Sequence, residues 1–398
     1  MNALHRGVIT LLRSAITGER LALPEGFSME EADQLIRSQS LLPLAYQGAY
    51  NCGVSMQTQL MQKYQQMYYS ILLSNEKQMW EIQKLFQAFE ESGIDYLPVK
   101  GCNLKALYPR PEMRQMGDAD VLIREAQYEA ICELLQKSGF AEGVQSCYER
   151  AWKKPELYLE LHTQLLPSAE KDLCRYFGNG WERAQHSSGH RYDLSVEDAY
   201  VFVFTHMTKH FRFCGIGARQ LIDIHVYRKA YPEMDAAKIQ KAMKQLHLER
   251  FHSNILRLLE VWFEGVETDP VTDFITEYVF SEGNWGSGQI QLLSEGVIRA
   301  QEHQSDRHSR AHSLMAMLFP SLYLMQMSYN VLYRHPYLYP FFWVVRWFDV
   351  LIHKPGRILK RFRQTAAVTD EAVENRRQVL NYMGLDFHYA DAEADEDK

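Results

Sequence analysis

Two aspartates that stand two positions apart are the first candidates for chemistry in this sequence. Asp118 and Asp120 lie in the segment GDADVLI, whose alternation predicts a β-strand. Because side chains alternate between the faces of a strand, both carboxylates would project from one face and the apolar side chains from the other. Adjacent carboxylates repel each other unless a cation lies between them, and Mg²⁺ prefers oxygen ligands. The pattern indicates a divalent-metal site, or else the solvent-facing side of an edge strand.

A second predicted strand supplies a third carboxylate. In residues 157–165, LYLELHTQL, leucines alternate with polar residues, so Glu160 and His162 share the polar face. If this strand lies beside the strand of Asp118 and Asp120, three carboxylates converge on one site. Such a triad can hold two Mg²⁺ or Mn²⁺ ions for in-line phosphoryl or nucleotidyl transfer. His162 would then contact a second substrate or orient Glu160.

A tight turn precedes the two aspartates. Residues 94–99 predict a short apolar strand, in which Pro98 suits an edge or a bulge because it has no N–H to donate. Gly101 permits a turn into a short helix, whose free N–H groups would point at an anion such as a triphosphate. Lys100 and Arg114 are candidates to neutralise phosphate oxygens, although lysine and arginine in loops are also commonly just solvated.

These segments together resemble the uncharacterised nucleotidyltransferase family, which belongs to the DNA polymerase β-like nucleotidyltransferase superfamily. The resemblance covers residues 90–230 and rests on Lys100-Gly101, Leu107-Tyr108, Arg114, Gly117–Ile123, Glu160-Leu161-His162, His206–His210 and Leu221–Ile224. It implies an α+β fold with a small mixed sheet, and transfer of a nucleoside monophosphate from a nucleoside triphosphate to an unidentified acceptor. The catalytic metal ligands would be Asp118, Asp120 and Glu160, and the nucleotide would be bound by Lys100, Gly101, Cys102 and Arg114.

One residue departs from the pattern of the superfamily. Cys102 stands where these proteins usually have serine, so the expected hydroxyl contact to a phosphate is missing and the backbone N–H groups of the turn would remain. A second function therefore stays open, namely a catalytically inactive nucleotide-binding or scaffold protein with the same fold.

Two pairs of residues further along the chain are candidates for the substrate cleft. His206 and His210 are four apart, as are Arg219 and Asp223, which places each pair on one face of a predicted helix. The histidines would contact the nucleotide or acceptor, form a polar helix–helix seam, or ligate zinc if further ligands joined them. Arg219 and Asp223 would form an ion pair on the helix surface. The resemblance implies that this region packs against the sheet, so all four residues would line the cleft with His162.

The remainder of the chain surrounds the α+β unit with helices. We expect a helical region at residues 1–92, a nucleotidyltransferase-like domain at 93–192, a helical domain at 193–389 and a disordered acidic tail at 390–398. Apolar residues at helical spacing predict one long helix over residues 57–91, which would pack on the catalytic sheet.

Composition narrows the classes of function. The chain has 398 residues and a formal net charge of −7, which argues against an extended nucleic-acid surface, because such surfaces are normally basic. The six cysteines include no C-x-x-C pair, which favours reduced thiols in the cytoplasm over disulfides or a zinc site.

Residues 337–363 combine an apolar segment with a basic one. The run YLYPFFWVV at 337–345 is too short to cross a membrane, and basic residues follow it up to Arg363. Two interpretations fit, a peripheral contact with an anionic membrane surface or burial of the aromatic side chains against the helical domain. We expect burial.

Overall fold

The computed structural model describes residues 1–145, 149–166, 171–213, 215–282, 331–353 and 369–385, and a few residues between 293 and 329. Within these residues helices surround one mixed sheet, so the predicted α+β class is confirmed. The predicted tail at 390–398 and the basic segment at 354–363 lie outside the described residues. The domain boundaries proposed from the sequence remain a prediction.

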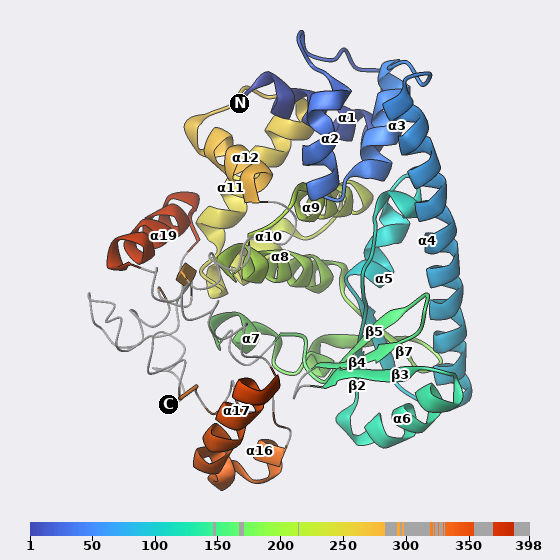
Figure 1. Ribbon diagram of the computed structural model, residues 1–398, viewed down its shortest axis with the longest axis vertical. Coiled ribbons are helices and arrows are strands. Elements are labelled where there is room, and N and C mark those ends of the chain that lie inside the picture. The colour runs from blue at the N-terminus through green and yellow to red at the C-terminus, as the bar shows by residue number, and fades with distance from the viewer. Residues whose placement is uncertain are drawn as a thin grey trace.

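Four helices precede the sheet. They are α1 (Ala3–Thr17), α2 (Met29–Ser38), α3 (Leu42–Cys52) and α4 (Gln59–Glu91). Helix α4 is the long helix predicted from the sequence, and it forms one side of the molecule (Figure 1). Thr58 caps this helix, because its side chain accepts a hydrogen bond from the Met61 N–H at 3.2 Å. The buried residues of α4 recur at intervals of three, four or seven positions, so one face of the helix packs on the rest of the fold.

The described strands form one sheet in the order β3-β4-β5-β2-β1-β7-β6. The strands are β1 (Tyr96–Val99), β2 (Ala119–Ile123), β3 (Ala141–Gln145), β4 (Glu149–Lys153), β5 (Tyr158–His162), β6 (Ala184–Ser188) and β7 (Arg191–Leu194). Strand β2 is antiparallel to β1 and parallel to β5. The two strands predicted to carry the carboxylates are therefore neighbours, as expected.

Helices cover both faces of this sheet (Figure 1). On one face, Val121 and Ile123 pack in a core with α4 and α6 (Tyr128–Lys137). On the other face, Asp120 and Leu122 lie on the side of α8 (Val196–Phe213) and α9 (Ala218–Ala230). The apolar and acidic faces predicted for this strand are thus both present.

The other described helices are short connections or belong to the C-terminal half. They are α5 (Gly101–Leu104), α7 (Lys171–Phe177), α10 (Ala236–Gln245), α11 (Glu249–Leu259), α12 (Pro270–Glu282), α16 (Val331–Arg334), α17 (Tyr339–His353) and α19 (Asp370–Met383). No helix in the described part of the chain combines the length and the apolar character needed to cross a bilayer.

Strand β1 is internal, which corrects the suggestion that Pro98 marks an edge strand. It lies between β2 and β7, but β7 pairs with it only where Tyr96 faces Arg191. The Tyr96 N–H donates to the His190 carbonyl at 3.1 Å. N–H groups two residues apart point to the same side of a strand, so the N–H that Pro98 lacks would point to the same side as that of Tyr96. Because the pairing with β7 is limited to Tyr96, position 98 lies just beyond it and proline is tolerated there.

Strand β3 corresponds to a strand that the sequence predicts over residues 140–148, but three other strands, β4, β6 and β7, have no counterpart among the predicted strands. Strands β6 and β7 pair antiparallel across the turn at Gly189, whose φ of +53° suits glycine. This glycine was a usable signal, because two-residue hairpin turns favour it. Strand β7 is only four residues long and half-buried throughout, so its alternation is too weak to detect.

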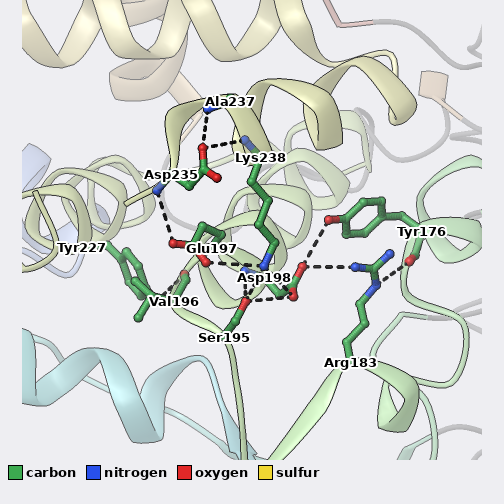
Figure 2. A network of polar contacts seen from close by, with 10 residues as sticks. All are labelled: Tyr176, Arg183, Ser195, Val196, Glu197, Asp198, Tyr227, Asp235, Ala237 and Lys238. Carbon is green, nitrogen blue, oxygen red and sulfur yellow. Dashed lines mark hydrogen bonds and ion pairs between the residues drawn. The ribbon is translucent and has the colours of Figure 1, made fainter. Parts of the chain in front are cut away.

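A polar network holds the N-terminal end of α8 in place (Figure 2). At its centre, Asp198 accepts a hydrogen bond from Ser195 Oγ at 2.9 Å and lies 3.2 Å from both Arg183 Nη1 and Lys238 Nζ. Burial opposes ionisation of Asp198, but Ser195 and Lys238 hold its pKa below the usual value. Since Lys238 belongs to α10 and Arg183 precedes β6, the network fixes α8 relative to the sheet.

Candidate active site

The carboxylates predicted to carry chemistry lie in one cavity. The parallel pairing of β2 and β5 sets Asp120 directly beside Glu160. Asp118, Asp120, Glu160 and His162 all line a cavity of about 270 Å³ between the sheet and helices α8 and α9. The sequence predicted each of these residues, and the register of two strands brings them together.

Asp120 is the buried centre of the site. Its Oδ1 atom lies 2.5 Å from Lys100 Nζ and 2.9 Å from His162 Nε2. The same His162 nitrogen lies 3.7 Å from Glu160 Oε2, so His162 bridges the two carboxylates. His162 is thus a group that positions carboxylates, one of the two roles considered for it.

Three side chains have the spacing needed to hold one metal ion. Asp120, Glu160 and His162 each offer a ligand atom, and these atoms lie within 4.8 Å of one another. Two of the three predicted metal ligands belong to this cluster, whereas Asp118 lies in the cavity but outside the cluster. Two carboxylates and one imidazole fit Mn²⁺ well, and Mg²⁺ if the oxygens and water complete its shell.

The carboxylates carry more negative charge than their neighbours neutralise. Burial and the nearby Asp120 and Asp118 raise the pKa of Glu160 to about 8. Burial and Asp120 also raise the pKa of Asp118. Burial opposes ionisation of Asp120 as well, but Lys100 and His162 outweigh it and hold the pKa well below the usual range. The Lys100 ammonium is therefore shared by several carboxylates, and a divalent cation would neutralise the negative charge that remains.

The turn before α5 presents Lys100 to the carboxylates. Lys100 has φ +48°, a conformation that non-glycine residues rarely adopt, and its side chain reaches Asp120. A Cβ atom on Gly101 would lie 2.4 Å from Met116 Sδ, so a larger residue there would displace the Met116 side chain. Both residues line the cavity, as predicted.

Cys102 lies apart from the carboxylates. It lines a separate cavity of about 450 Å³ on the far side of the turn, together with Arg191 and Asp193. Burial raises the pKa of its thiol to about 12, so the thiol is protonated at neutral pH. The structure therefore does not bring this predicted nucleotide-binding residue to the site.

Arg114 lines the cavity, but its charge is already paired. Its Nε and Nη2 atoms donate to Asp223 Oδ1 at 2.7 Å and Oδ2 at 3.0 Å, and Tyr108 Oη also donates to Asp223 at 2.7 Å. This corrects the predicted ion pair between Arg219 and Asp223, because Asp223 is buried and engaged by Arg114. A partner 109 residues away in sequence is invisible to helical spacing.

Arg219 also lines the cavity, and within the described part of the chain it has no carboxylate partner. Its Nη1 donates to the Gln115 carbonyl at 2.8 Å, and its Nε is buried without a hydrogen-bond partner. Burial and the neighbouring Arg114 lower the pKa of Arg219, as expected for a cation that is not fully compensated. Its guanidinium is thus available to an anion in the cavity.

His206 and His210 reach the cavity from α8. Their Nε2 atoms are 3.3 Å apart, so the predicted shared face is confirmed. Burial holds the pKa of His206 well below its ordinary value and lowers that of His210 to about 3, which keeps both imidazoles neutral. Among the described residues, the group with metal-ligand spacing consists of Asp120, Glu160 and His162 and does not include this pair.

The cavity also contains polar residues that the sequence did not single out. Glu149, Gln115, Lys209 and Gln220 line it. Glu149 opens the unpredicted strand β4, and its carboxylate contributes to the raised pKa of Glu160. Without β4 in the prediction, no signal placed Glu149 near the site.

Lys105 is a buried lysine beneath the site. Its side chain is buried, with 2% of the residue exposed, and its Nζ donates to Gln78 Oε1 at 3.3 Å. Burial and the nearby Arg114 lower the pKa of Lys105 from 10.5 to about 8. The folded state therefore disfavours the ammonium that the unfolded chain carries.

We expect Lys105→Met to stabilise the protein at neutral pH. A pKa lowered from 10.5 to about 8 corresponds to a penalty of about 3 kcal/mol below pH 8, which fades as pH rises toward 10.5. The gain in the free energy of unfolding is therefore expected to shrink by about half between pH 7 and roughly pH 9.5. Urea unfolding at both pH values measures this gain in the free energy of unfolding, and Lys137→Met, at an exposed lysine, is the control. A gain that is independent of pH, or a loss at neutral pH, would contradict the assignment.

The fold and the site together are those of an α+β protein with a sheet whose polar face carries clustered carboxylates, three side chains that could hold a metal ion, and adjacent cations. The family described as "Uncharacterised nucleotidyltransferase" matches residues 25–264 of the chain, well beyond the segment in which the motifs lie. The chain belongs to this family of nucleotidyltransferases. Searches of curated proteins and of solved structures find no match.

Proposed function

We propose that the protein is a metal-dependent nucleotidyltransferase, which moves a nucleoside monophosphate from a nucleoside triphosphate to an acceptor hydroxyl. The observation that carries the proposal is the pairing of Asp120 with Glu160 in a cavity that Lys100 and Arg219 also line. Family membership supports the general class of reaction.

Five of the side chains that line the cavity have a role in this reaction. Asp120 and Glu160, with His162 beside them, would hold Mg²⁺ or Mn²⁺, while Asp118 would hold a second ion or its water shell. When bound, such ions polarise the α-phosphate and lower the pKa of the attacking hydroxyl. His162 keeps the two carboxylates together through its contacts of 2.9 and 3.7 Å. Lys100 neutralises Asp120 before the substrate enters.

The transfer itself exchanges a phosphoanhydride bond for a phosphoester bond. The acceptor oxygen bonds to the α-phosphorus and gives up its proton to solvent water, the bond from that phosphorus to the oxygen that bridges to the β-phosphate breaks, and pyrophosphate leaves with the bonding electrons. Negative charge accumulates on the departing pyrophosphate, so a cation must face it. Arg219 fits this role better than Arg114, because Asp223 already takes the charge of Arg114. This revises the pair of phosphate contacts expected from the sequence.

We expect Arg219→Gln to weaken binding of the nucleoside triphosphate by roughly ten- to a hundredfold, since a hydrogen bond to a charged group contributes about 1.5–3 kcal/mol. The substitution leaves the Gln115 carbonyl with a donor and creates no buried charge. Calorimetric titration with each triphosphate in the presence of Mn²⁺ measures the change. The control is Arg110→Gln, which removes an arginine that bonds to Tyr68 outside the cavity. Unchanged affinity in Arg219→Gln would place the triphosphate elsewhere.

The proposed activity is tested by label transfer. The full-length protein is incubated with each of the four α-labelled nucleoside triphosphates, Mg²⁺ or Mn²⁺, and a cell extract as the source of acceptor. The expected result is a labelled acceptor and released pyrophosphate, both abolished by a chelator. Metal-dependent binding of triphosphate without any transfer would instead support the inactive nucleotide-binding protein. Absence of binding as well as transfer would reject both functions.

A further inference from the structure

Helix α17 presents an apolar stripe to solvent. Phe341 and Phe348 are each 62% exposed, Tyr337 just before the helix is 73% exposed, and Val344 lies exposed between them. Phe341, Val344 and Phe348 are spaced by three and four positions, so they share one face of α17, and Tyr337 precedes the helix in the short 3-10 helix Pro336–Leu338. The stripe is therefore a continuous surface rather than scattered apolar residues.

The opposite face of α17 is anchored to the protein. Tyr339 Oη and Trp343 Nε1 both donate to the Pro320 carbonyl, at 2.5 and 3.1 Å. The ring of Phe319 lies 5.0 Å from that of Trp343 and 5.2 Å from that of Trp347. These contacts set the rotation of the helix and leave the stripe pointing outward.

This arrangement corrects part of the burial expected from the sequence. The inner aromatic residues do pack on the protein, but none of the α17 residues whose side chains are described is fully buried. The helix lies at the periphery of the molecule with α16 (Figure 1). An amphipathic helix normally turns its apolar face inward, whereas α17 has apolar residues on both faces.

Charge in the sequence after α17 narrows the choice of partner. Residues 354–363 carry five lysines and arginines and no acidic residue, although the whole chain has a net charge of −7. The helix itself adds Arg346, with Asp349 as its acidic residue. An exposed aromatic stripe continued by a basic run is complementary to a surface that is both apolar and anionic.

The size of the stripe argues against a second copy of the chain as the partner. Aromatic side chains bury about 200 Å² each, so three that are roughly two-thirds exposed offer on the order of 400 Å². A stable protein complex buries roughly 800 Å² on each partner. Insertion into a lipid surface has no such area requirement, because aromatic residues enter the headgroup region individually.

We propose that the stripe of Tyr337, Phe341, Val344 and Phe348 docks the protein on an anionic membrane surface. Helix α17 would lie in the plane of the membrane with these residues in the headgroup region, and the basic residues that follow it in the sequence would attract the anionic lipids. The helix would not span the bilayer. Such docking would restrict the enzyme to acceptors found at that surface.

Vesicle flotation tests the proposal on the full-length protein. Phosphatidylcholine vesicles with about 30% phosphatidylserine are compared with pure phosphatidylcholine vesicles, at about 0.1 M and about 1 M NaCl. The protein is expected to float with the anionic vesicles at low salt, and much less with neutral vesicles or at high salt. Phe341→Glu/Phe348→Glu is expected to reduce the floating fraction at least about tenfold, because two charges would enter the headgroup region.

Matched variants separate membrane docking from general effects of added charge. Leu73→Glu/Trp80→Glu adds the same charge at α4 positions that are 63% and 61% exposed, and it is expected to float like the wild type. Phe341→Trp/Phe348→Trp keeps an apolar stripe and is expected to retain binding. Equal flotation with neutral vesicles, equal flotation of the Phe→Glu variant, or no flotation of the wild type would overturn the proposal. A dimer in solution that the Phe→Glu variant breaks, without any vesicle binding, would assign the stripe to a second copy.

Discussion

Asp120→Asn is expected to lower metal-dependent nucleotidyl transfer by about a thousandfold or more. Asp120 belongs to the group with metal-ligand spacing, and its carboxylate also contacts the Lys100 ammonium and His162. Its negative charge therefore lies at the centre of the site. An amide of the same shape keeps one oxygen for Lys100 but loses the negative charge that a divalent cation needs. A thousandfold loss corresponds to about 4 kcal/mol of transition-state stabilisation, within the range that metal catalysis supplies.

Asp95→Asn is a closely matched control for that variant. Asp95 lies 2.7 Å from Arg124 and 3.0 Å from His190, so it also pairs with one cation and one histidine. It precedes β1 at the end remote from Lys100, and it does not line the site. Label transfer, metal titration and thermal unfolding are measured for both variants. If Asp120→Asn retains activity within tenfold of the Asp95→Asn protein, the carboxylate cluster is not the catalytic centre.

The sequence predicted the parts of the site that depend on local alternation. Asp118 and Asp120 on one strand, and Glu160 and His162 on another, follow from the two-residue period of side chains. Their convergence required the two strands to be neighbours, which periodicity does not encode. The resemblance to a known family supplied that step, and the pairing of Asp120 with Glu160 bears it out.

The parts that failed depend on contacts between distant residues or on weak local signals. Asp223 was assigned to Arg219 by helical spacing, yet a bidentate interaction with Arg114 is geometrically better and takes the carboxylate. Cys102 was placed at the phosphates because it stands where the superfamily usually has serine; it lines the cavity behind the turn, and its part in nucleotide binding stays a prediction. Helix α17 was expected to be buried because it is aromatic, and one of its two apolar faces is not.

The ion pair between Arg114 and Asp223 is expected to support stability, not substrate binding. Both side chains are nearly inaccessible to solvent, and burial of Arg114 is offset by Asp223, which raises the arginine pKa. Breaking a buried pair by removing one partner leaves an uncompensated charge and costs about 3–5 kcal/mol. Arg114→Met and Asp223→Leu are therefore each expected to lower the free energy of unfolding by that amount.

The double variant Arg114→Met/Asp223→Leu is the decisive member of this series. It removes both charges together, so its loss of stability is expected to be smaller than the sum of the two single losses by at least about 2 kcal/mol. Urea unfolding of the four proteins without nucleotide measures this coupling. Additive losses would mean that the two residues do not act as a pair.

Nucleotide affinity then separates the two arginines of the cavity. If Arg114 were the phosphate contact that its position before Asp118 suggests, Arg114→Met would keep its stability and lose triphosphate binding. The geometry predicts the reverse, with Arg219→Gln losing affinity at nearly unchanged stability, because Arg219 is bonded to a backbone carbonyl and Arg114 to a buried carboxylate. Of the two arginines that line this cavity, Arg219 has no carboxylate partner among the described residues, so it is the one that can bind an incoming anion.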